Sequence, residues 1–315
     1  MPLLDRFRGC LLGGAVGDAL GMPTEGYTAQ EILSRFGPIK EMLPALEGHF
    51  HSGLLAGQFT DDTEETLLLA ESLAESCGFS AENFAERLAS WGSAWIQDEG
   101  RNRGVGFATR SAVEALIAGM AWQESGLSIP TCGSAMRASP IGLLYHFNLD
   151  LVRGYADLQS LPTHNSPVAR AASVAVAIAV ALGLHGFSKE AMAHAAASYA
   201  GRLDGEFGDK LLYACSLRGK SAVEALERIG TSPLAIETVP AAFYCFLNFK
   251  GEEGLISAAG GGGDTDSIAS IAGSLFGASQ GASWIPQRWL GLLEERKRIE
   301  DAATSLWQLS SSFCR

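Results

Sequence analysis

The chain has 315 residues, of which 47% are hydrophobic and 18% are charged, and its formal net charge is −12 at pH 7. This composition predicts a soluble protein with a large core, and the acidic charge argues against a nucleic-acid backbone or an anionic membrane surface as the main partner. Six cysteines without a Cys-x-x-Cys pair are expected to be reduced thiols. The first residues lack the layout of a signal peptide, and together with the reduced cysteines this favours a cytoplasmic protein.

Helical patterns run along most of the chain. Glycines punctuate the apolar segment 11–27, which suggests a helix in close contact with a neighbour. Apolar residues at helical spacing predict further helices over 61–76, 80–97, 106–119, 168–184, 188–200, 221–229 and 265–281. The longest apolar stretch, 168–184, carries Arg170 and many alanines, which favours a buried helix over a membrane span. No alternating strand series appears, so we expect one compact, orthogonal multi-helix domain of the all-α class over residues 1–315.

Four glycines at 260–263 run directly into two aspartates. One interpretation is a loop that ends in a helix cap, because glycine permits tight turns and aspartate is a good N-cap. The other is a metal site, since Asp264 and Asp266 with the hydroxyls of Thr265 and Ser267 form a compact set of hard oxygen ligands. For this stretch alone the helix cap is the favoured interpretation.

A second cluster, Thr60, Asp61 and Asp62, stands at another predicted helix start. Alone, it is explained by the preference of acidic residues for the first turn of a helix. The two clusters lie about 200 positions apart, so only tertiary folding joins them. Joined, they supply four carboxylates, enough for two Mg²⁺ or Mn²⁺ ions, whose charge would offset the repulsion among the carboxylates.

Two further carboxylates lie near the start of the chain. Glu25 follows a Pro-Thr turn and, taken alone, is explained as an exposed loop residue. Asp18 lies within the glycine-punctuated helix, and we interpret it as a buried cap or an internal hydrogen-bond partner.

Five segments together resemble the ADP-ribosylglycohydrolase family, in that family's order and over residues 6–280 approximately. They are GDALGMPTE, FTDDTE, CGSAMRASP, THNSPVA and GGGGDTDSIA. The resemblance implies an all-α fold with a two-metal centre in a cleft. It also implies cleavage of the N- or O-glycosidic bond at C1″ of ADP-ribose.

The resemblance implies a site residue by residue. The metal ligands would be Thr60, Asp61, Asp62, Asp264, Asp266 and Ser267. Glu25 matches a mobile glutamate beside the metals. The segment 130–137 resembles the family's diphosphate-binding loop, where Gly133 and Ser134 would offer backbone N–H groups to phosphate. Cys132 replaces the usual asparagine of that loop, which puts a side-chain contact there in doubt.

Three further positions concern the rest of the substrate. His164 matches a histidine that contacts the phosphates. Gly104 and Gly106 lie in a segment that resembles the family's contact with the distal ribose, where glycine permits close backbone approach. Asp98 stands where arginine-specific members carry an acidic residue, although the following EGRNRG departs from their pattern.

These expectations describe a metal-dependent hydrolase that removes mono-ADP-ribose from a protein side chain, with arginine slightly favoured. Glu25 or Asp62 would take the proton of the attacking water. The alternatives are a non-catalytic ADP-ribose-binding protein, and a hydrolase of a free ADP-ribose derivative or of ADP-ribosylated nucleic acid. A D-x-D phosphatase lacks its preceding strand here, and a P-loop lacks its Gly-Lys-Ser/Thr ending. The acceptor, the choice between Mg²⁺ and Mn²⁺ and the oligomeric state, with a monomer as one option, are left open.

Overall fold

Helices form nearly all of the regular structure in residues 2–313, the part of the chain that this computed structural model describes. The α-helices are α1 (Leu3–Gly21), α2 (Ala29–Phe36), α3 (Asp61–Glu75), α4 (Ala81–Gln97), α5 (Phe107–Ile117), α6 (Trp122–Ser125), α7 (Gly133–Met136), α8 (Ser139–Leu144), α9 (Leu149–Leu158), α10 (Pro167–Leu184), α11 (Lys189–Ala200), α12 (Gly205–Ser216), α13 (Ala222–Ile229), α14 (Ala235–Asn248), α15 (Gly251–Ala259), α16 (Thr265–Gln280), α17 (Gln287–Leu290) and α18 (Arg296–Phe313). Two 3-10 turns are η1 (Met22–Thr24) and η2 (Glu99–Arg101). Within residues 2–313 the β contacts are isolated bridges, which confirms the all-α prediction.

The seven helices predicted after residue 60 are present, and their observed ends differ from the prediction by at most two residues. The first helix, expected in segment 11–27, instead spans Leu3–Gly21, and the 3-10 turn Met22–Thr24 follows it. Local capping explains the starts of the predicted helices. The side chains of Ser80, Ser188 and Ser221 each accept a hydrogen bond from the backbone N–H three residues later. This contact satisfies an N–H group that has no partner inside the helix.

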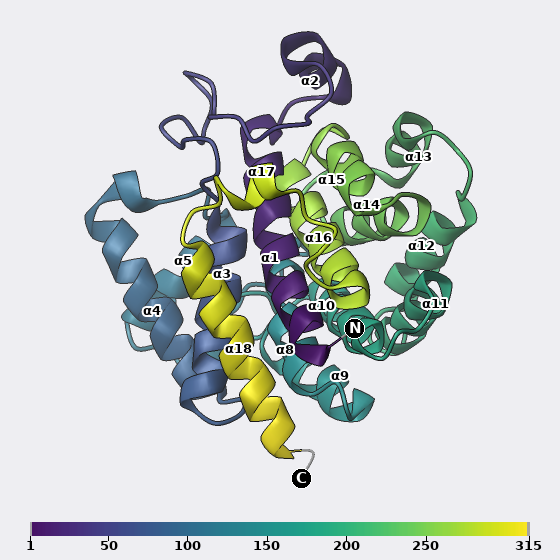
Figure 1. Ribbon diagram of the computed structural model, residues 1–315. Helices are drawn as coiled ribbons and strands as arrows, with labels where there is room; N and C mark the ends of the chain where they lie inside the picture. The colour runs from purple at the N-terminus through teal and green to yellow at the C-terminus, as the bar shows by residue number, and fades with distance from the viewer. Residues whose placement is uncertain (1, 314–315) are drawn as a thin grey trace.

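Helix α1 lies between α16 and α18, as the purple, green and yellow ribbons of Figure 1 show. Glycines let α1 and α16 touch through their backbones. A Cβ atom added to Gly17 would lie 2.1 Å from the carbonyl oxygen of Ala269, and one added to Gly13 would lie 2.3 Å from that of Gly273. The close approach expected for the small-residue helices is therefore confirmed.

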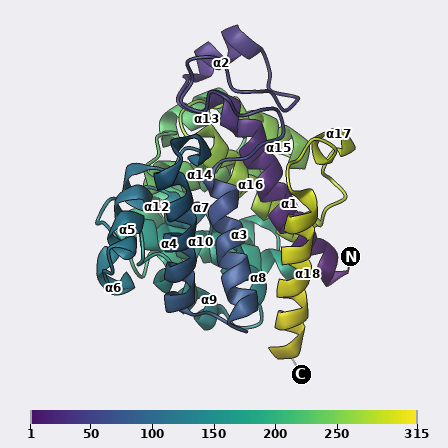
Figure 2. The same ribbon diagram turned by 90° about the vertical axis from the view of Figure 1, so that its left-hand side faces the viewer.

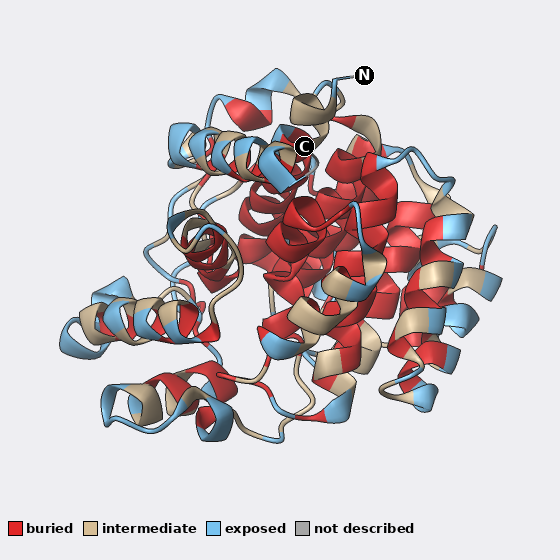
Figure 3. Cartoon of the chain, turned by 90° about the horizontal axis from the view of Figure 1, so that it is seen from below, coloured by how far each residue is buried: buried red, intermediate tan, exposed pale blue. Residues whose placement is uncertain are grey.

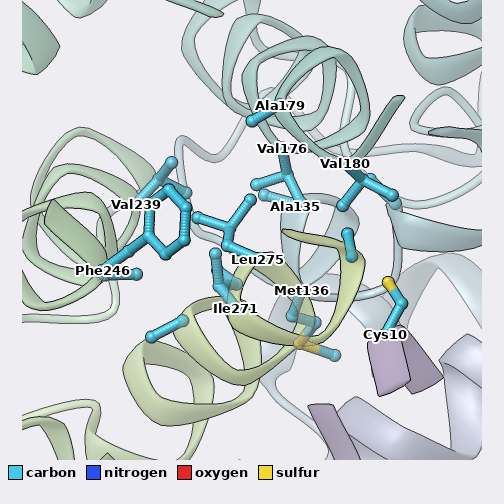
Figure 4. Packing of buried hydrophobic residues seen from close by; sticks show 14 of the residues in the cluster. Cys10, Ala135, Met136, Val176, Ala179, Val180, Val239, Phe246, Ile271 and Leu275 are labelled. Atoms are coloured by element: carbon cyan, nitrogen blue, oxygen red, sulfur yellow. The ribbon is translucent and has the colours of Figure 1, made fainter. Parts of the chain in front are cut away.

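Helix α10 forms the centre of the core. It is long and apolar enough to cross a membrane by length and composition, but 83% of it is buried inside the domain, as expected for a core helix. Figure 3 shows buried ribbon gathered in the middle and exposed positions on the outer helices. Figure 4 shows side chains of α10, α14 and α16 meeting there, among them Val176, Val180, Val239, Phe246, Ile271 and Leu275.

The end of α1 is tied to the start of α16. The Thr265 hydroxyl donates to the carbonyl oxygen of Gly21 at 2.9 Å, and it accepts a hydrogen bond from Thr24 Oγ1 at 3.1 Å. Thr265, considered above as one of four oxygen ligands, thus has its hydroxyl committed to α1. Helix α2 and the irregular segment 37–60 lie together at the top of the domain in Figures 1 and 2.

Candidate active site

Folding brings the two acidic clusters of the sequence together. Asp61 and Asp62 begin α3, while Asp264 caps α16 and Asp266 lies in its first turn. The Ser267 hydroxyl of α16 donates a hydrogen bond to Asp62 Oδ1 at 3.2 Å, across 205 positions of sequence. The juxtaposition that the metal hypothesis requires is therefore present. We call the four aspartates the acidic centre.

Glu25 follows η1 and lies beside the acidic centre. Its Oε2 atom is 2.6 Å from Nε2 of His51, which is itself 3.9 Å from Asp266 Oδ2. Nε2 of His49 lies 2.7 Å from the carbonyl oxygen of Glu25. The ligand atoms of Glu25, His51 and Asp266 all lie within 4.8 Å of one another, a spacing that suits a metal ion. Glu25 is thus held from both its side chain and its backbone.

Burial and mutual repulsion make full ionisation of the acidic centre energetically unfavourable when no cation is bound. Burial raises the pKa of Asp62 well above its ordinary value, and the charge of Asp266 raises it further. The pKa of Asp266 is also raised well above its ordinary value, first by burial and then by Glu25. The pKa values of Asp61 and Glu25 are raised in the same direction, again chiefly by burial. These shifts are what nearby like charges in a poorly hydrated site produce.

The donor set of the acidic centre fits a hard divalent cation. It consists of carboxylate and hydroxyl oxygens, the ligands that Mg²⁺ and Mn²⁺ prefer. Asp62 Oδ2 is buried without a hydrogen-bond partner among the described residues, so its lone pairs are available to a ligand. The buried arginine nearby, Arg137, is paired with Glu65 instead. A bound cation would offset the charge that no side chain there neutralises.

Asp18 anchors the start of α3. Its carboxylate accepts hydrogen bonds from both the backbone and the hydroxyl of Thr60, each at 2.9 Å, and from both groups of Thr63 at 3.0 and 2.6 Å. The interpretation of Asp18 as a buried hydrogen-bond partner is confirmed. The Thr60 hydroxyl also accepts from the N–H of Asp62, so it is occupied by structural contacts, and Thr60 does not line the cavity.

A cavity of about 280 Å³ opens beside the acidic centre. It is lined by residues from α3, α5, α7, α16 and the loops between them: Glu25, Asp61, Asp62, Gly104, Gly106, Phe107, Ala108, Thr109, Ile129, Thr131, Cys132, Gly133, Met136, His164, Pro233, Asp264, Asp266 and Ser267. Most of the predicted site residues thus meet at one cavity.

Two of the predicted substrate-binding residues lie outside this lining. Ser134 is fully buried, and its hydroxyl bonds to the carbonyl oxygen of Ala169 and to Ser173 Oγ. Asp98 is exposed, and its carboxylate accepts a hydrogen bond from the N–H of Gly100. The prediction for Ser134 concerned its backbone N–H group, which these side-chain contacts do not test, and the lining residue nearest to Asp98 in sequence is Gly104.

Cys132 is directed at the acidic centre. Its Sγ lies 3.1 Å from Asp264 Oδ2 and 3.6 Å from Ser267 Oγ. Thr238, which sequence reasoning missed, donates to the same oxygen of Asp264. Burial raises the pKa of Asp264, and these two hydrogen bonds act against that rise. The position that departs from the family's motif therefore does make a side-chain contact within the site.

Sequence reasoning also missed His49 and His51, although the pattern His-Phe-His in a glycine-flanked loop is a visible signal. Gly104 explains how this loop approaches. It has φ +95°, and a Cβ there would lie 2.4 Å from Cε1 of His51. A Cβ on Gly133 would likewise lie 2.6 Å from Cε1 of His164. Both glycines therefore make room for a histidine at the cavity.

Adding Mg²⁺ or Mn²⁺ to EDTA-treated protein is expected to raise its melting temperature by several degrees. A cation that binds the folded chain and not the unfolded one contributes about 2.7 kcal/mol at 100 times its Kd. Differential scanning fluorimetry measures this shift. The Asp98→Asn variant is the matched control and should show the same shift. An equal rise from NaCl at the same ionic strength would contradict a specific cation site.

Comparisons with known proteins agree on one family. A family model described as ADP-ribosylglycohydrolase matches residues 1–313. ADP-ribosylarginine hydrolase Tri1 of Pseudomonas putida is 30% identical over 96% of this chain and 78% of its own. Human ADP-ribosylhydrolase ARH3 is 28% identical over 96% of this chain and 93% of its own.

The fold agrees as well. A solved structure titled ADP-ribosylglycohydrolase-related protein complex matches with a TM-score of 0.73 and 29% identity, and covers 98% of this chain and 99% of the other. The sequence resemblance, the helical fold and the family model thus lead to the same result. The chain belongs to the ADP-ribosylglycohydrolase family and is a glycohydrolase enzyme.

Proposed function

We propose that this chain hydrolyses the glycosidic bond at C1″ of ADP-ribose attached to a protein side chain. The observation that carries the proposal is the acidic centre, which two distant helix starts build on the wall of one cavity. In this proposal two Mg²⁺ or Mn²⁺ ions are held by Asp61, Asp62, Asp264, Asp266 and Ser267, whereas the Thr60 hydroxyl, expected as a ligand from the sequence, bonds to Asp18 and the N–H of Asp62. When bound, they would bind the ribose hydroxyls, orient C1″ and lower the pKa of a water molecule.

The protein's own carboxylates would handle the proton. Cleavage at C1″ passes through an oxocarbenium-like transition state and needs a group that takes the proton of water. Glu25 is the first candidate, because His51 fixes its carboxylate at the cavity wall. Burial raises the pKa of Glu25 above its ordinary value, and the charge of Asp264 acts in the same direction. Asp62, with its unpartnered buried oxygen, is the second candidate.

We propose arginine as the acceptor to test first. The similarity to an ADP-ribosylarginine hydrolase supports this choice. The sequence argument from Asp98 does not, because its side chain lies outside the cavity lining. Serine, another protein side chain that the sequence leaves open as acceptor, is the comparison arm.

The test is release of ADP-ribose from proteins mono-ADP-ribosylated on arginine and, separately, on serine, with Mg²⁺, Mn²⁺ or EDTA. Cation-dependent release from one substrate supports the proposal and names the acceptor. Glu25→Gln is expected to lose activity and keep cation binding, whereas Asp98→Asn should keep both. Absence of release from both substrates, with ADP-ribose still bound in calorimetry, would contradict hydrolysis of protein side-chain adducts.

A further inference from the structure

Arg137 is a buried cation at the start of a hydrogen-bond chain that reaches the cavity. Its side chain is fully buried and pairs with Glu65. The guanidinium also donates to Gln159 Oε1 at 2.9 Å and to Thr163 Oγ1 at 2.7 Å. An arginine side chain has only donors, so the direction of each of these hydrogen bonds is fixed.

The hydrogen bond from Arg137 determines where the Thr163 hydroxyl donates its own proton. Its oxygen accepts from Arg137, and its own proton needs an acceptor because the side chain is fully buried. Over residues 2–313 the only acceptor in reach is Nδ1 of His164, at 2.8 Å. The Thr163 hydroxyl therefore donates to Nδ1, which must carry no proton. Burial, together with the charge of Arg137, lowers the pKa of His164 to about 3, so the ring stays neutral.

A neutral imidazole without a proton on Nδ1 carries it on Nε2. Nε2 of His164 lies 3.0 Å from Thr131 Oγ1, which can then only accept from it. The proton of the Thr131 hydroxyl is left free. Both His164 and Thr131 line the cavity, so the chain ends there in the O–H group of Thr131.

We infer that Arg137, acting through Thr163, fixes His164 as its Nε2–H tautomer, so that Thr131, which accepts from this N–H, presents its own O–H as a hydrogen-bond donor to an anionic group in the cavity. Arg137, Thr163 and His164 are positioning residues, whereas Thr131 is a binding residue. A phosphate oxygen has the chemistry that such a donor binds. That this anion is the diphosphate of ADP-ribose rests on the proposed function, but the tautomer does not.

The Thr131 donor complements the rest of the cavity. The acidic centre offers oxygens that bind cations, whereas the Thr131 hydroxyl offers its proton. With the opposite tautomer this hydroxyl would donate to Nε2, and an anion would face the lone pairs of its oxygen. Fixing the tautomer in advance removes this repulsion without a net charge on the imidazole.

Nitrogen-15 NMR of the histidine rings tests the tautomer directly. The chain has six histidines, and a His164→Gln variant identifies the signals of His164. We expect Nε2 protonated and Nδ1 unprotonated in the wild type, unchanged between about pH 6 and 8 because the ring does not titrate there. Thr163→Val removes the hydroxyl at nearly constant volume and should change the tautomer. Thr163→Ser keeps the hydroxyl and should restore it. A protonated Nδ1 in the wild type would overturn the inference.

Binding of ADP-ribose in the presence of Mg²⁺, measured by calorimetry, tests the consequence. Thr163→Val and Thr131→Val should each weaken binding by about tenfold or more, the cost of one lost hydrogen bond to a charged group. Thr163→Ser should bind like the wild type. Unchanged affinity in both valine variants would overturn the role of the Thr131 donor. If the wild type has the Nε2–H tautomer but does not bind ADP-ribose, the proposed function fails and the tautomer assignment stands.

Discussion

Replacing Gly17 with alanine is expected to destabilise the folded protein by at least about 3 kcal/mol, because overpacking against backbone has no cheap relaxation. The new Cβ would lie 2.1 Å from the carbonyl oxygen of Ala269, so α1 and α16 would have to separate. Asp18 is the next residue of α1, and Asp266 lies on α16. The same change is therefore expected to weaken cation binding. Urea unfolding and the cation-induced shift in melting temperature measure the two effects.

Gly154→Ala in α9 is the matched control for this prediction. A Cβ at Gly154 meets no atom within 4 Å. Alanine there is expected to be neutral or to stabilise the protein by about 0.5–1 kcal/mol, through its better helix propensity. Equal stability of the two variants would show that the α1–α16 contact tolerates a methyl group, and the packing argument would fail.

Replacing Asp266 with asparagine is expected to lower glycohydrolase activity by at least about 100-fold while making the cation-free protein more stable. The pKa of Asp266 is raised in the folded state, so its contribution to stability is present below the unfolded pKa of about 4 and is lost as the pH rises through the folded pKa. Asparagine carries no charge, so the variant does not lose this stability as the pH rises. Melting curves in EDTA from pH 5 to about 8 measure the gain in stability, and activity assays in Mg²⁺ measure the loss of activity.

Asp98→Asn removes the same chemical group from an exposed position outside the cavity, and neither its activity nor its cation-free stability should change. If Asp266→Asn retained the wild-type rate, Asp266 would not be a required ligand. If the variant were less stable than the wild type in EDTA, the result would contradict a destabilising repulsion within the acidic centre.

The helices could be predicted from the sequence because their signals are local. Apolar spacing and capping serines placed each of the seven helices predicted after residue 60 to within two residues, whereas α1 begins eight residues before segment 11–27. The glycines of segment 11–27 indicated a close neighbour, but α16 is identified as that neighbour only by three-dimensional contacts such as that between Gly17 and Ala269. Partner choice depends on residues far apart in the chain, and a single sequence does not encode such pairs in any local pattern.

The site was predictable in its carboxylates and less so in its supporting residues. Paired aspartates at two helix starts suggested a shared metal centre, and the structure joins them through Ser267 and Asp62. His51 and Thr238 were not predicted as site residues, because each contacts a carboxylate that lies 26 positions away in the sequence. Asp98 stays a prediction, because it is exposed outside the cavity lining and its carboxylate accepts from the N–H of Gly100.

The position of α1 between α16 and α18 has a consequence for how the chain folds. The first helix gains its main partners only when segments roughly 240 residues later are available, as the contact between Thr24 and Thr265 illustrates. Contacts of such long range slow folding, because loop-closure entropy opposes them until they form. Until the later helices are available, α1 and the apolar α10 expose apolar surface to water. We therefore expect slow refolding and a marked tendency to aggregate at high protein concentration.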